Sequence, residues 1–290
     1  MRTTVLFGLS LAALALVLAA TATGKPAEPA AIPGCAKGSL NLLEEGRLTL
    51  GTDNPAFPPW WGGAPKKPWQ VSNPASGKGY ESAVAYAVAR QLGFTKGQVD
   101  WVHVPFAQSY RPGDKDFDFY MAQVSYTPER DKVVDFSNAY YYVNQALVGR
   151  EETDIAGAAR IADLKPYRLG AQLGTTSYQY IVNNIRPDEQ PLAYRTNDLA
   201  VQALKNGRID GIVVDLPTAF YVTAVQVEDG VIVGQFPNRG KREHFGMVFE
   251  QGNTLKRCVN KALNRLWANG TMKRLQNVWL ARVGGAPVLR

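Results

Sequence analysis

An arginine that follows a hydroxyl side chain is the most distinctive chemical feature of this sequence. Arg130 lies in the stretch 125–137, which also holds Ser125 and a proline at a helix start. A run of tyrosines follows shortly after this stretch. A guanidinium is a planar fork that binds a carboxylate through two parallel hydrogen bonds. Arg130 is therefore a candidate anion clamp, and Ser125 can offer a hydroxyl beside it. In the alternative interpretation, Arg130 is a surface residue that pairs with Glu129 or Asp131.

Two threonines and two aspartates could complete a site for a small zwitterion. Thr175 and Thr176 follow a glycine where a predicted strand turns into a helix. The unpaired backbone N–H groups of a helix start favour anions, although the same pattern also suits an ordinary threonine N-cap. Asp215 ends an apolar strand and suits an ammonium group, with helix capping as the alternative. Asp53 ends the first predicted strand and adds a second acid at the same edge.

Short apolar runs alternate with helical patterns along the chain, which is typical of an α/β protein. The sequence predicts strands at 47–52, 99–104, 117–124, 141–149, 167–173, 191–195, 211–216, 231–236 and 244–250, and helices at 79–92, 161–164, 178–185 and 254–268, with a last helix to about residue 280. The pattern stops and restarts, which indicates two α/β lobes joined by crossings near 146–149 and 238–244. Because ligands of open α/β sheets bind outside the carboxyl ends of the strands, two such lobes facing one another would form a cleft.

Several pieces of the chain, in their order and spacing, resemble a known family. They are residues 51–60, Thr127-Pro128-Glu129-Arg130, Gln172-Leu173-Gly174-Thr175-Thr176-Ser177, Val213-Val214-Asp215-Leu216-Pro217 and residues 266–280. Together they resemble the extracytoplasmic solute-binding proteins of the polar amino acid class of ABC importers, over about residues 46–280. The resemblance implies a periplasmic-binding-protein-like fold of two α/β domains joined by a two-stranded hinge.

The resemblance also implies a function and a set of site residues. The protein would bind an amino acid or a similar zwitterion by hinge closure, as a monomer without a cofactor, and deliver it to an ABC permease. Arg130 would hold the ligand's α-carboxylate, with Thr175 and Thr176 facing it, and Asp215 would hold the α-amino group. Three aromatic residues are candidate pocket walls, with membership of the core as the alternative. The full set of candidate ligand-binding residues is Asp53, Phe57, Trp60, Phe106, Gln123, Ser125, Arg130, Gln172, Thr175, Thr176 and Asp215.

Two glutamines leave the identity of the ligand open. Gln123 stands two residues before Ser125, where the family usually has a small, glycine-like residue, so it could narrow the pocket or hydrogen-bond the ligand side chain. Gln172 stands where some relatives carry a charged or other polar specificity residue. No particular amino acid is predicted.

The N-terminus is typical of an exported protein. Residues 1–22 combine Met1-Arg2, an apolar run and small residues at a cleavage site, so they predict a secretory signal peptide, with an uncleaved anchor as the alternative. Residues 23–45 form a spacer and N-terminal segment, whose Ala- and Pro-rich first half predicts flexibility. The expected divisions that follow are 46–147 for lobe 1, 148–243 for lobe 2 and 244–290 for a return to lobe 1. The expected location is the periplasm or the outer face of the cytoplasmic membrane.

The two cysteines, Cys35 and Cys258, predict one disulfide in an exported chain. Lipidation of Cys35 is the alternative, because residues 32–35 faintly resemble a lipobox. Lys25 and Glu28 argue against it, since these charged residues separate Cys35 from the apolar run.

Composition and missing motifs argue against other classes. The formal net charge is +7, but basic residues are interspersed with acids, whereas nucleic-acid binding favours a basic stripe with interleaved aromatics. His103 and His244 are the only histidines, which disfavours a metal site, and neither a phosphate-binding loop nor a Gly-x-Ser-x-Gly elbow is present. Two alternative functions stay open. One is a ligand-sensing domain. The other is dehydration of a cyclic prephenate- or arogenate-type acid, with Asp215, Asp53 or Glu129 as the general acid.

Overall fold

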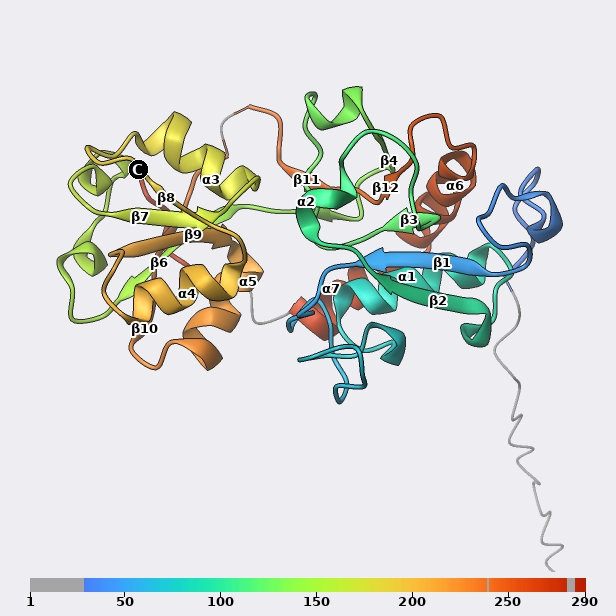
Figure 1. Ribbon diagram of the computed structural model, residues 1–290, viewed down its shortest axis with the longest axis horizontal. Helices are drawn as coiled ribbons and strands as arrows, with labels where there is room; N and C mark the ends of the chain where they lie inside the picture. The colour runs from blue at the N-terminus through green and yellow to red at the C-terminus, as the bar shows by residue number, and fades with distance from the viewer. Residues whose placement is uncertain (1–28, 239, 281–284) are drawn as a thin grey trace, which may run out of the picture.

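Two five-stranded β-sheets form two lobes that lie side by side along the long axis of the molecule (Figure 1). The computed structural model describes residues 29–238, 240–280 and 285–290. The predicted signal peptide, residues 1–22, lies outside the described residues. Each lobe has its own buried apolar clusters around its sheet. The predicted two-lobe α/β fold is confirmed.

The sheet of lobe 1 has the strand order β2-β1-β3-β12-β4. β1 pairs in parallel with β2 and β3, whereas β12 runs antiparallel to β3 and β4. Four of the five residues of β1 are buried, as expected for a central strand that is covered on both faces. The strands are β1 (Leu48–Thr52), β2 (Val99–His103), β3 (Phe119–Tyr120), β4 (Asp135–Phe136) and β12 (Val248–Phe249).

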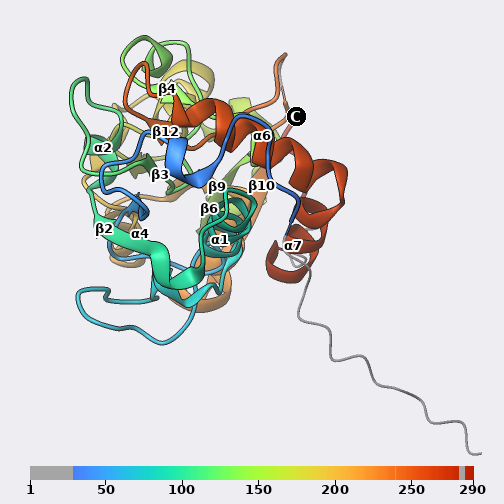
Figure 2. The same cartoon turned by 90° about the vertical axis from the view of Figure 1, so that its right-hand side faces the viewer.

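Three helices of lobe 1 pack against one another although they come from opposite ends of the chain. α1 (Tyr80–Gln91), α6 (Leu255–Ala268) and α7 (Thr271–Leu280) are in mutual contact (Figure 2), while α2 (Phe106–Ser109) follows β2. Apolar residues recur every three or four positions in α6, so a single face of the helix enters the core. The buried residues of that face are Leu255, Cys258, Val259, Ala262, Leu263 and Leu266.

The sheet of lobe 2 has the strand order β10-β6-β9-β7-β8. Its strands are β6 (Gln145–Arg150), β7 (Leu169–Gln172), β8 (Leu192–Tyr194), β9 (Gly211–Asp215) and β10 (Gly230–Gln235). β7 pairs in parallel with β8 and β9, and β6 runs antiparallel to β9 and β10. The helices are α3 (Thr176–Tyr180), α4 (Asn197–Lys205) and α5 (Leu216–Tyr221), with π-helical turns over Ile181–Ile185 and Val222–Gln226. Short 3-10 turns cover Lys37–Ser39, Pro74–Ser76, Lys96–Gln98, Arg130–Lys132, Asp154–Gly157 and Ile161–Leu164.

The lobes are connected by two crossings that begin at a small two-stranded sheet. β5 (Tyr141–Tyr142) pairs antiparallel with β11 (His244–Phe245). β6 already belongs to the sheet of lobe 2, so the first crossing lies before Gln145. The expected crossing at 146–149 and the expected lobe boundary at 147 are therefore placed a few residues too late. The sequence pattern did not separate β5 from β6, because the two strands follow one another almost directly.

The C-terminal residues return to lobe 2 and not to lobe 1. Val288 forms a β-bridge with Gln235 at the end of β10, and the backbone N–H of Arg290 donates to the carbonyl of Ala159. Leu289 is 2% exposed and packs in a core cluster of lobe 2. The expected return of 244–290 to lobe 1 is therefore wrong for residues 285–290. A short apolar sequence does not specify which of two similar cores it joins.

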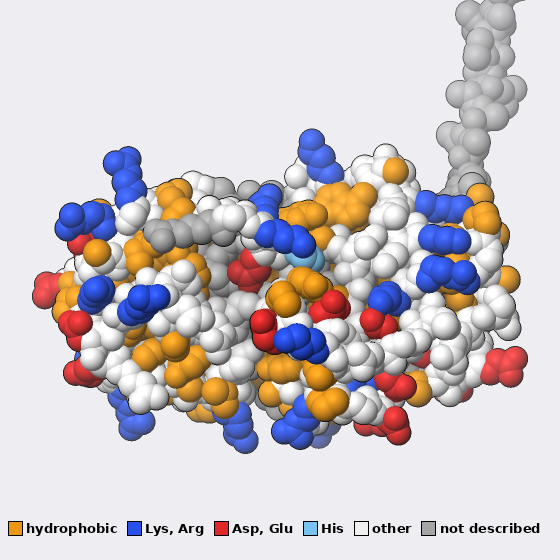
Figure 3. All heavy atoms as spheres, turned by 90° about the horizontal axis from the view of Figure 1, so that it is seen from above, with side chains coloured by type: hydrophobic (Ala, Val, Ile, Leu, Met, Phe, Trp, Pro, Cys, Tyr) orange, Lys and Arg blue, Asp and Glu red, His pale blue; other side chains and the backbone are white. Residues whose placement is uncertain are grey.

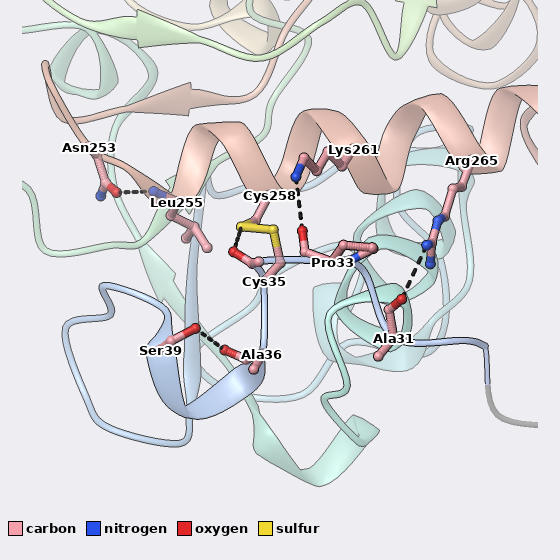
Figure 4. Close-up of a disulfide and its surroundings, with 11 residues drawn as sticks. Ala31, Pro33, Cys35, Ala36, Ser39, Asn253, Leu255, Cys258, Lys261 and Arg265 are labelled. Carbon is pink, nitrogen blue, oxygen red and sulfur yellow. Dashed lines mark hydrogen bonds between the residues drawn. A yellow bond between two sulfur atoms is a disulfide. The ribbon is translucent and has the colours of Figure 1, made fainter.

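The N-terminal segment is fastened to α6 by a disulfide and by hydrogen bonds (Figure 4). Cys35 is bonded to Cys258, which confirms the predicted disulfide and excludes lipidation of Cys35. Lys261 Nζ donates to the carbonyl of Pro33 over 2.9 Å, and Arg265 donates to the carbonyls of Ala30 and Ala31. Ile32 is 4% exposed in the core of lobe 1. Residues 29–34 are therefore held against α6, with Ile32 buried, in contrast to the flexible spacer that their composition predicts.

Candidate functional site

A cavity of about 100 Å³ lies between the two lobes, and residues of both lobes line it. All eleven candidate residues from the sequence are in its lining. Lobe 1 contributes Asp53, Phe57, Trp60, Phe106, Gln123, Ser125 and Arg130, and lobe 2 contributes Gln172, Thr175, Thr176 and Asp215. The structure therefore brings together a set of residues that spans more than half of the chain, whereas their roles stay predictions.

Strand ends place many of these side chains at the cavity. Asp53 comes directly after β1, Gln172 is the last residue of β7, and Asp215 is the last residue of β9. The carboxyl ends of parallel strands meet at one edge of a sheet, and helix starts follow them there. Thr175 is the N-cap of α3, so the turn after β7 brings the start of that helix to the cavity.

Arg130 is buried and contacts both lobes. It is 9% exposed, and its NH1 group donates to the carbonyl of Ser125 over 2.6 Å. Its NH2 group donates over 2.7 Å to the carbonyl of Gly174, which belongs to lobe 2. The guanidinium lies 4.4 Å from the ring centre of Tyr110 and 5.7 Å from that of Phe106. The alternative of an exposed arginine is therefore wrong.

The environment of Arg130 makes its charge available for a strong interaction. Burial lowers the pKa of Arg130, because the charged form loses hydration, while Tyr110 and the acids Glu243 and Asp215 oppose that change. A guanidinium that is short of water gains more from an incoming anion than an exposed one does. Arg130 thus has the position and the electrostatic environment of an anion clamp.

The hydroxyls of Ser125 and Thr176 are already hydrogen-bonded to a carboxylate that the sequence did not indicate. Ser125 Oγ and Thr176 Oγ1 each donate to Glu243 Oε1 over 2.6 Å. Gln145 Nε2 lies 3.2 Å from both oxygens of the same carboxylate. The hydroxyl of Thr175 instead accepts from the backbone of Tyr178, so the N-cap interpretation holds for that side chain.

Asp215 is the acid of lobe 2 at the centre of the site. Burial raises the pKa of Asp215 well above its usual range, and the nearby Glu243 carboxylate raises it further. A hydrogen bond from Gln145 Nε2 to Asp215 Oδ1, at 2.8 Å, partly offsets this effect. A cation that binds next to this buried carboxyl would stabilise its charged form.

Asp53 faces the cavity from lobe 1. Burial raises the pKa of Asp53, and the backbone N–H of Asn54 donates to its carboxyl group over 2.8 Å. His103 Nε2 lies 3.6 Å from Asp53 Oδ1. Asp53 can therefore accept a further hydrogen bond from a ligand group.

The three aromatic candidates have different surroundings. Trp60 is 1% exposed, packs edge-on against Phe245, and donates from Nε1 to Thr218 Oγ1 of lobe 2 over 3.1 Å. Phe57 lies 6.0 Å, between ring centres, from Tyr221 of lobe 2. Phe106 packs beside the Arg130 guanidinium. Trp60 is thus a core residue that also reaches the cavity, so both of its sequence interpretations hold.

Gln123 has an unusual backbone that a buried glutamate supports. Its φ angle is +53°, in the left-handed region that side chains other than glycine seldom adopt. Glu81 Oε1 accepts from the backbone N–H of Gln123 over 2.7 Å, and Glu81 Oε2 accepts from its side-chain amide. Burial raises the pKa of Glu81 to about 7, although hydrogen bonds from Tyr140 and Gln123 act to lower it. Glu81 therefore holds Gln123 at the cavity wall, a role for which the sequence contained no signal.

Gln172 and several residues missed from the sequence complete the wall. The amide Nε2 of Gln172 lies 3.5 Å from the carbonyl of Arg195, at the limit of a hydrogen bond. The lining residues that sequence analysis missed come from turns and helices without a distinctive pattern. They include Ser177, Thr196, Asn197, Asp198, Thr218, Tyr221 and Gln226.

The comparison with protein families decides the assignment. The family model of the bacterial extracellular solute-binding proteins, family 3, matches residues 62–282. The chain belongs to this family. Among curated relatives, the ABC transporter arginine-binding protein 1 of Escherichia coli is 28% identical over 170 residues, covering 57% of this chain and 67% of that protein. The glutamate-binding protein GluB of Corynebacterium efficiens is 29% identical over 250 residues, covering 82% and 80%.

Solved structures agree with the family assignment. An ancestral arginine-binding protein bound to glutamine superposes with a TM-score of 0.67 at 28% identity, covering 81% of this chain and 98% of that one. An ancestral amino-acid-binding protein described as a precursor of cyclohexadienyl dehydratase has a TM-score of 0.65 at 28% identity, covering 81% and 95%. The resemblance found in the sequence is confirmed.

Two further observations on this solute-binding protein concern the described residues. On the face in Figure 3, basic and acidic side chains are interspersed, and an acidic side chain lies recessed between the lobes. In the described part of the chain, no helix is long and apolar enough to cross a membrane, and no group of three His, Cys, Asp or Glu side chains is placed to hold a metal ion.

Proposed function

We propose that this solute-binding protein captures an amino acid, or a similar small zwitterion, between its lobes and delivers it to an ABC permease. The observation that carries the proposal is that a guanidinium and a carboxyl group from opposite lobes line one cavity: Arg130 from lobe 1 and Asp215 from lobe 2. A free amino acid carries both an anion and a cation on one carbon. Arg130 would bind the α-carboxylate and Asp215 the α-ammonium group.

Closure of the lobes gives these interactions their strength. A charge-assisted hydrogen bond contributes roughly 1.5–3 kcal/mol, and more when water is excluded. Because Asp215 and Arg130 lie on different lobes, a zwitterion between them would favour the closed arrangement over an open one. We infer that every ligand contact comes from a single chain, so a monomer would suffice.

The charges of the lining favour a ligand with a neutral or basic side chain. Its charged residues are Arg130 and the acids Asp53, Asp198 and Asp215. After pairing of Arg130 and Asp215 with the α-groups of the ligand, two acids would face its side chain. An acidic side chain would be repelled, whereas an ammonium or guanidinium would be attracted.

Thermal melting with each common amino acid tests the proposal on protein that begins at about Thr23. A ligand that binds only the folded state stabilises it, by about 2.7 kcal/mol when the ligand concentration is one hundred times its Kd. The melting temperature rises as a result. We expect one hit or a cluster of chemically related hits. If no amino acid raises the melting temperature, the amino acid assignment is wrong, and unusual amines and acids and the cyclic dehydratase substrates are tested next.

Dehydration of a cyclic prephenate-type acid is the second candidate, favoured by the raised pKa of Asp215. A buried carboxyl with a raised pKa is suited to act as a general acid. Incubation of the purified protein with prephenate and arogenate, followed by product analysis, tests this candidate. We expect no turnover, because a zwitterion-binding site already accounts for Asp215 and Arg130 in one cavity.

A further inference from the structure

The second crossing between the lobes carries a carboxylate to the edge of the ligand cavity. Glu243 directly precedes β11, and the backbone N–H of Val143 donates to the Glu243 carbonyl over 3.1 Å. The backbone of Glu243 is therefore held by the first crossing, and rotation of its side chain alone can move the carboxylate. Its Oε1 atom accepts hydrogen bonds from Ser125 of lobe 1 and Thr176 of lobe 2, both over 2.6 Å.

These two hydroxyls are donors that a ligand carboxylate at Arg130 would need. Ser125 and Thr176 line the cavity, and their oxygens are 3.3 Å apart. A hydroxyl has a single proton to donate. While Ser125 and Thr176 donate to Glu243, they can only accept from a group in the cavity. In the structure, the Glu243 carboxylate therefore occupies two donors that suit a ligand carboxylate.

Electrostatics make joint occupation by two carboxylates unfavourable. Glu243 is close enough to Asp215 to raise the pKa of that acid, and close enough to Arg130 to stabilise its charge. A ligand carboxylate that bound between Arg130 and the two hydroxyls would lie next to Glu243 in a site with little water. Like charges at such short range repel each other unless one of them moves away.

We propose that Glu243 competes with the ligand's carboxylate for the protons of Ser125 and Thr176, and that ligand binding displaces it. This inference rests on the proposed function and adds a specificity-determining residue to it. Glu243 then has two effects. It links the lobes through one hydroxyl from each, and it lowers the affinity for a ligand whose carboxylate must displace it.

The test compares amino acids with the amines that lack their α-carboxylate. Binding of L-arginine, L-glutamine and L-glutamate, and of agmatine, 4-aminobutanamide and 4-aminobutanoate, is measured by calorimetry. The proteins are the unchanged protein, Glu243→Gln and Glu243→Ala. Glu228→Gln is the matched control, because Glu228 is exposed in lobe 2 and its substitution alters the net charge equally.

The expected result is tighter binding of the amino acid that the unchanged protein prefers. Both Glu243 variants should bind it about tenfold more tightly or better, while the affinity for its amine counterpart stays within about twofold or falls. Equal or weaker amino acid binding in the variants overturns the inference. The inference is also overturned if the unchanged protein prefers the amine and the Glu243→Ala variant no longer binds it. Glu243 would then be a permanent counter-ion of a cationic ligand.

A ligand-free measurement separates this inference from the proposed function. Small-angle scattering of dialysed protein should give a larger radius of gyration for Glu243→Ala than for the unchanged protein, since one link between the lobes is lost. An unchanged radius contradicts the linking role. If neither the unchanged protein nor the variants bind any amino acid, the proposed function itself fails, whereas amino acid binding that Glu243 does not affect removes only the inference.

Discussion

The indole Nε1 of Trp60 donates a hydrogen bond to the hydroxyl of Thr218 over 3.1 Å, and the two residues belong to different lobes. Trp60 is fixed in lobe 1 by edge-on contacts with Tyr80, Tyr141 and Phe245. Thr218 lies in α5 of lobe 2, directly after the strand that carries Asp215. The hydrogen bond therefore joins a rigid aromatic cluster to the helix next to the predicted ammonium site.

The first prediction concerns this link. Thr218→Val removes the hydroxyl with almost no change in volume, so closure should lose about 1 kcal/mol and ligand affinity should fall about fivefold. Trp60→Phe should have a similar effect on affinity, plus a loss of stability from the smaller ring. A double-mutant cycle measured by calorimetry should give a coupling energy of about 0.5–1.5 kcal/mol. Strictly additive effects would mean that the link does not contribute to closure.

The second prediction concerns the anion clamp. Arg130→Ala should weaken amino acid binding by more than about a hundredfold, because two charge-assisted bonds to the carboxylate are lost. Arg130→Lys should recover little, since an ammonium cannot form the planar fork. The melting temperature should also fall by a few degrees, because Arg130 donates to Ser125 and Gly174.

The control for the clamp is Arg90→Ala, which removes an exposed arginine from α1 with the same change in charge. Affinity and melting temperature should both be unchanged in this variant. Binding retained in Arg130→Ala would overturn the assignment of Arg130 to the carboxylate.

The third prediction is a pH dependence of stability that Glu81 causes. The pKa of Glu81 is raised from 4.5 to about 7 in the folded protein. Below pH 4.5, Glu81 is protonated in both the folded and the unfolded state. Between pH 4.5 and about 7, only the folded state keeps the proton. The free energy of unfolding should therefore fall as the pH rises from about 4.5 to 7, by about 3 kcal/mol from this group.

Urea denaturation at pH 5 and pH 8 checks this dependence. Glu81→Gln is less stable at pH 5, because its amide cannot replace all the hydrogen bonds to Gln123 and Tyr140. Its stability should nevertheless fall less between the two pH values than that of the unchanged protein. Acids that do not interact with Glu81, such as Asp118, titrate in both proteins and cancel in the comparison. Parallel pH profiles would show that Glu81 does not titrate in this range.

The predicted strands largely exist, and the main error has a backbone cause. The apolar run 117–124 predicts one long strand, but β3 is only Phe119–Tyr120. Gln123 turns out of the extended conformation at a φ of +53° and points its backbone N–H at Glu81, 42 residues away. Hydrophobicity indicates that a segment is buried, whereas such a turn depends on a partner outside the segment.

Some candidate residues were found because they lie at strand ends and near helix starts, which local patterns reveal, and the others came from the resemblance to the family. Asp53, Gln172 and Asp215 each stand at or directly after the end of a buried strand, and the cavity lies where those ends meet. Glu243 and Glu81 have no such pattern. An acid next to two basic residues, and an acid in the first turn of a helix, both suit an exposed position equally well.

The sequence by itself determined the family, the two-lobe architecture, the disulfide and the candidate residues, because periodicity, spacing and residue type are local properties. Only the tertiary structure decided which lobe the C-terminus joins, which acid holds Ser125 and which hydroxyl Trp60 meets. The bond from Ser125 to Glu243 joins residues 118 positions apart, and that from Trp60 to Thr218 joins residues 158 positions apart. Such pairs form only when segments far apart in the sequence come together in the folded protein, and nothing in either segment alone specifies its partner.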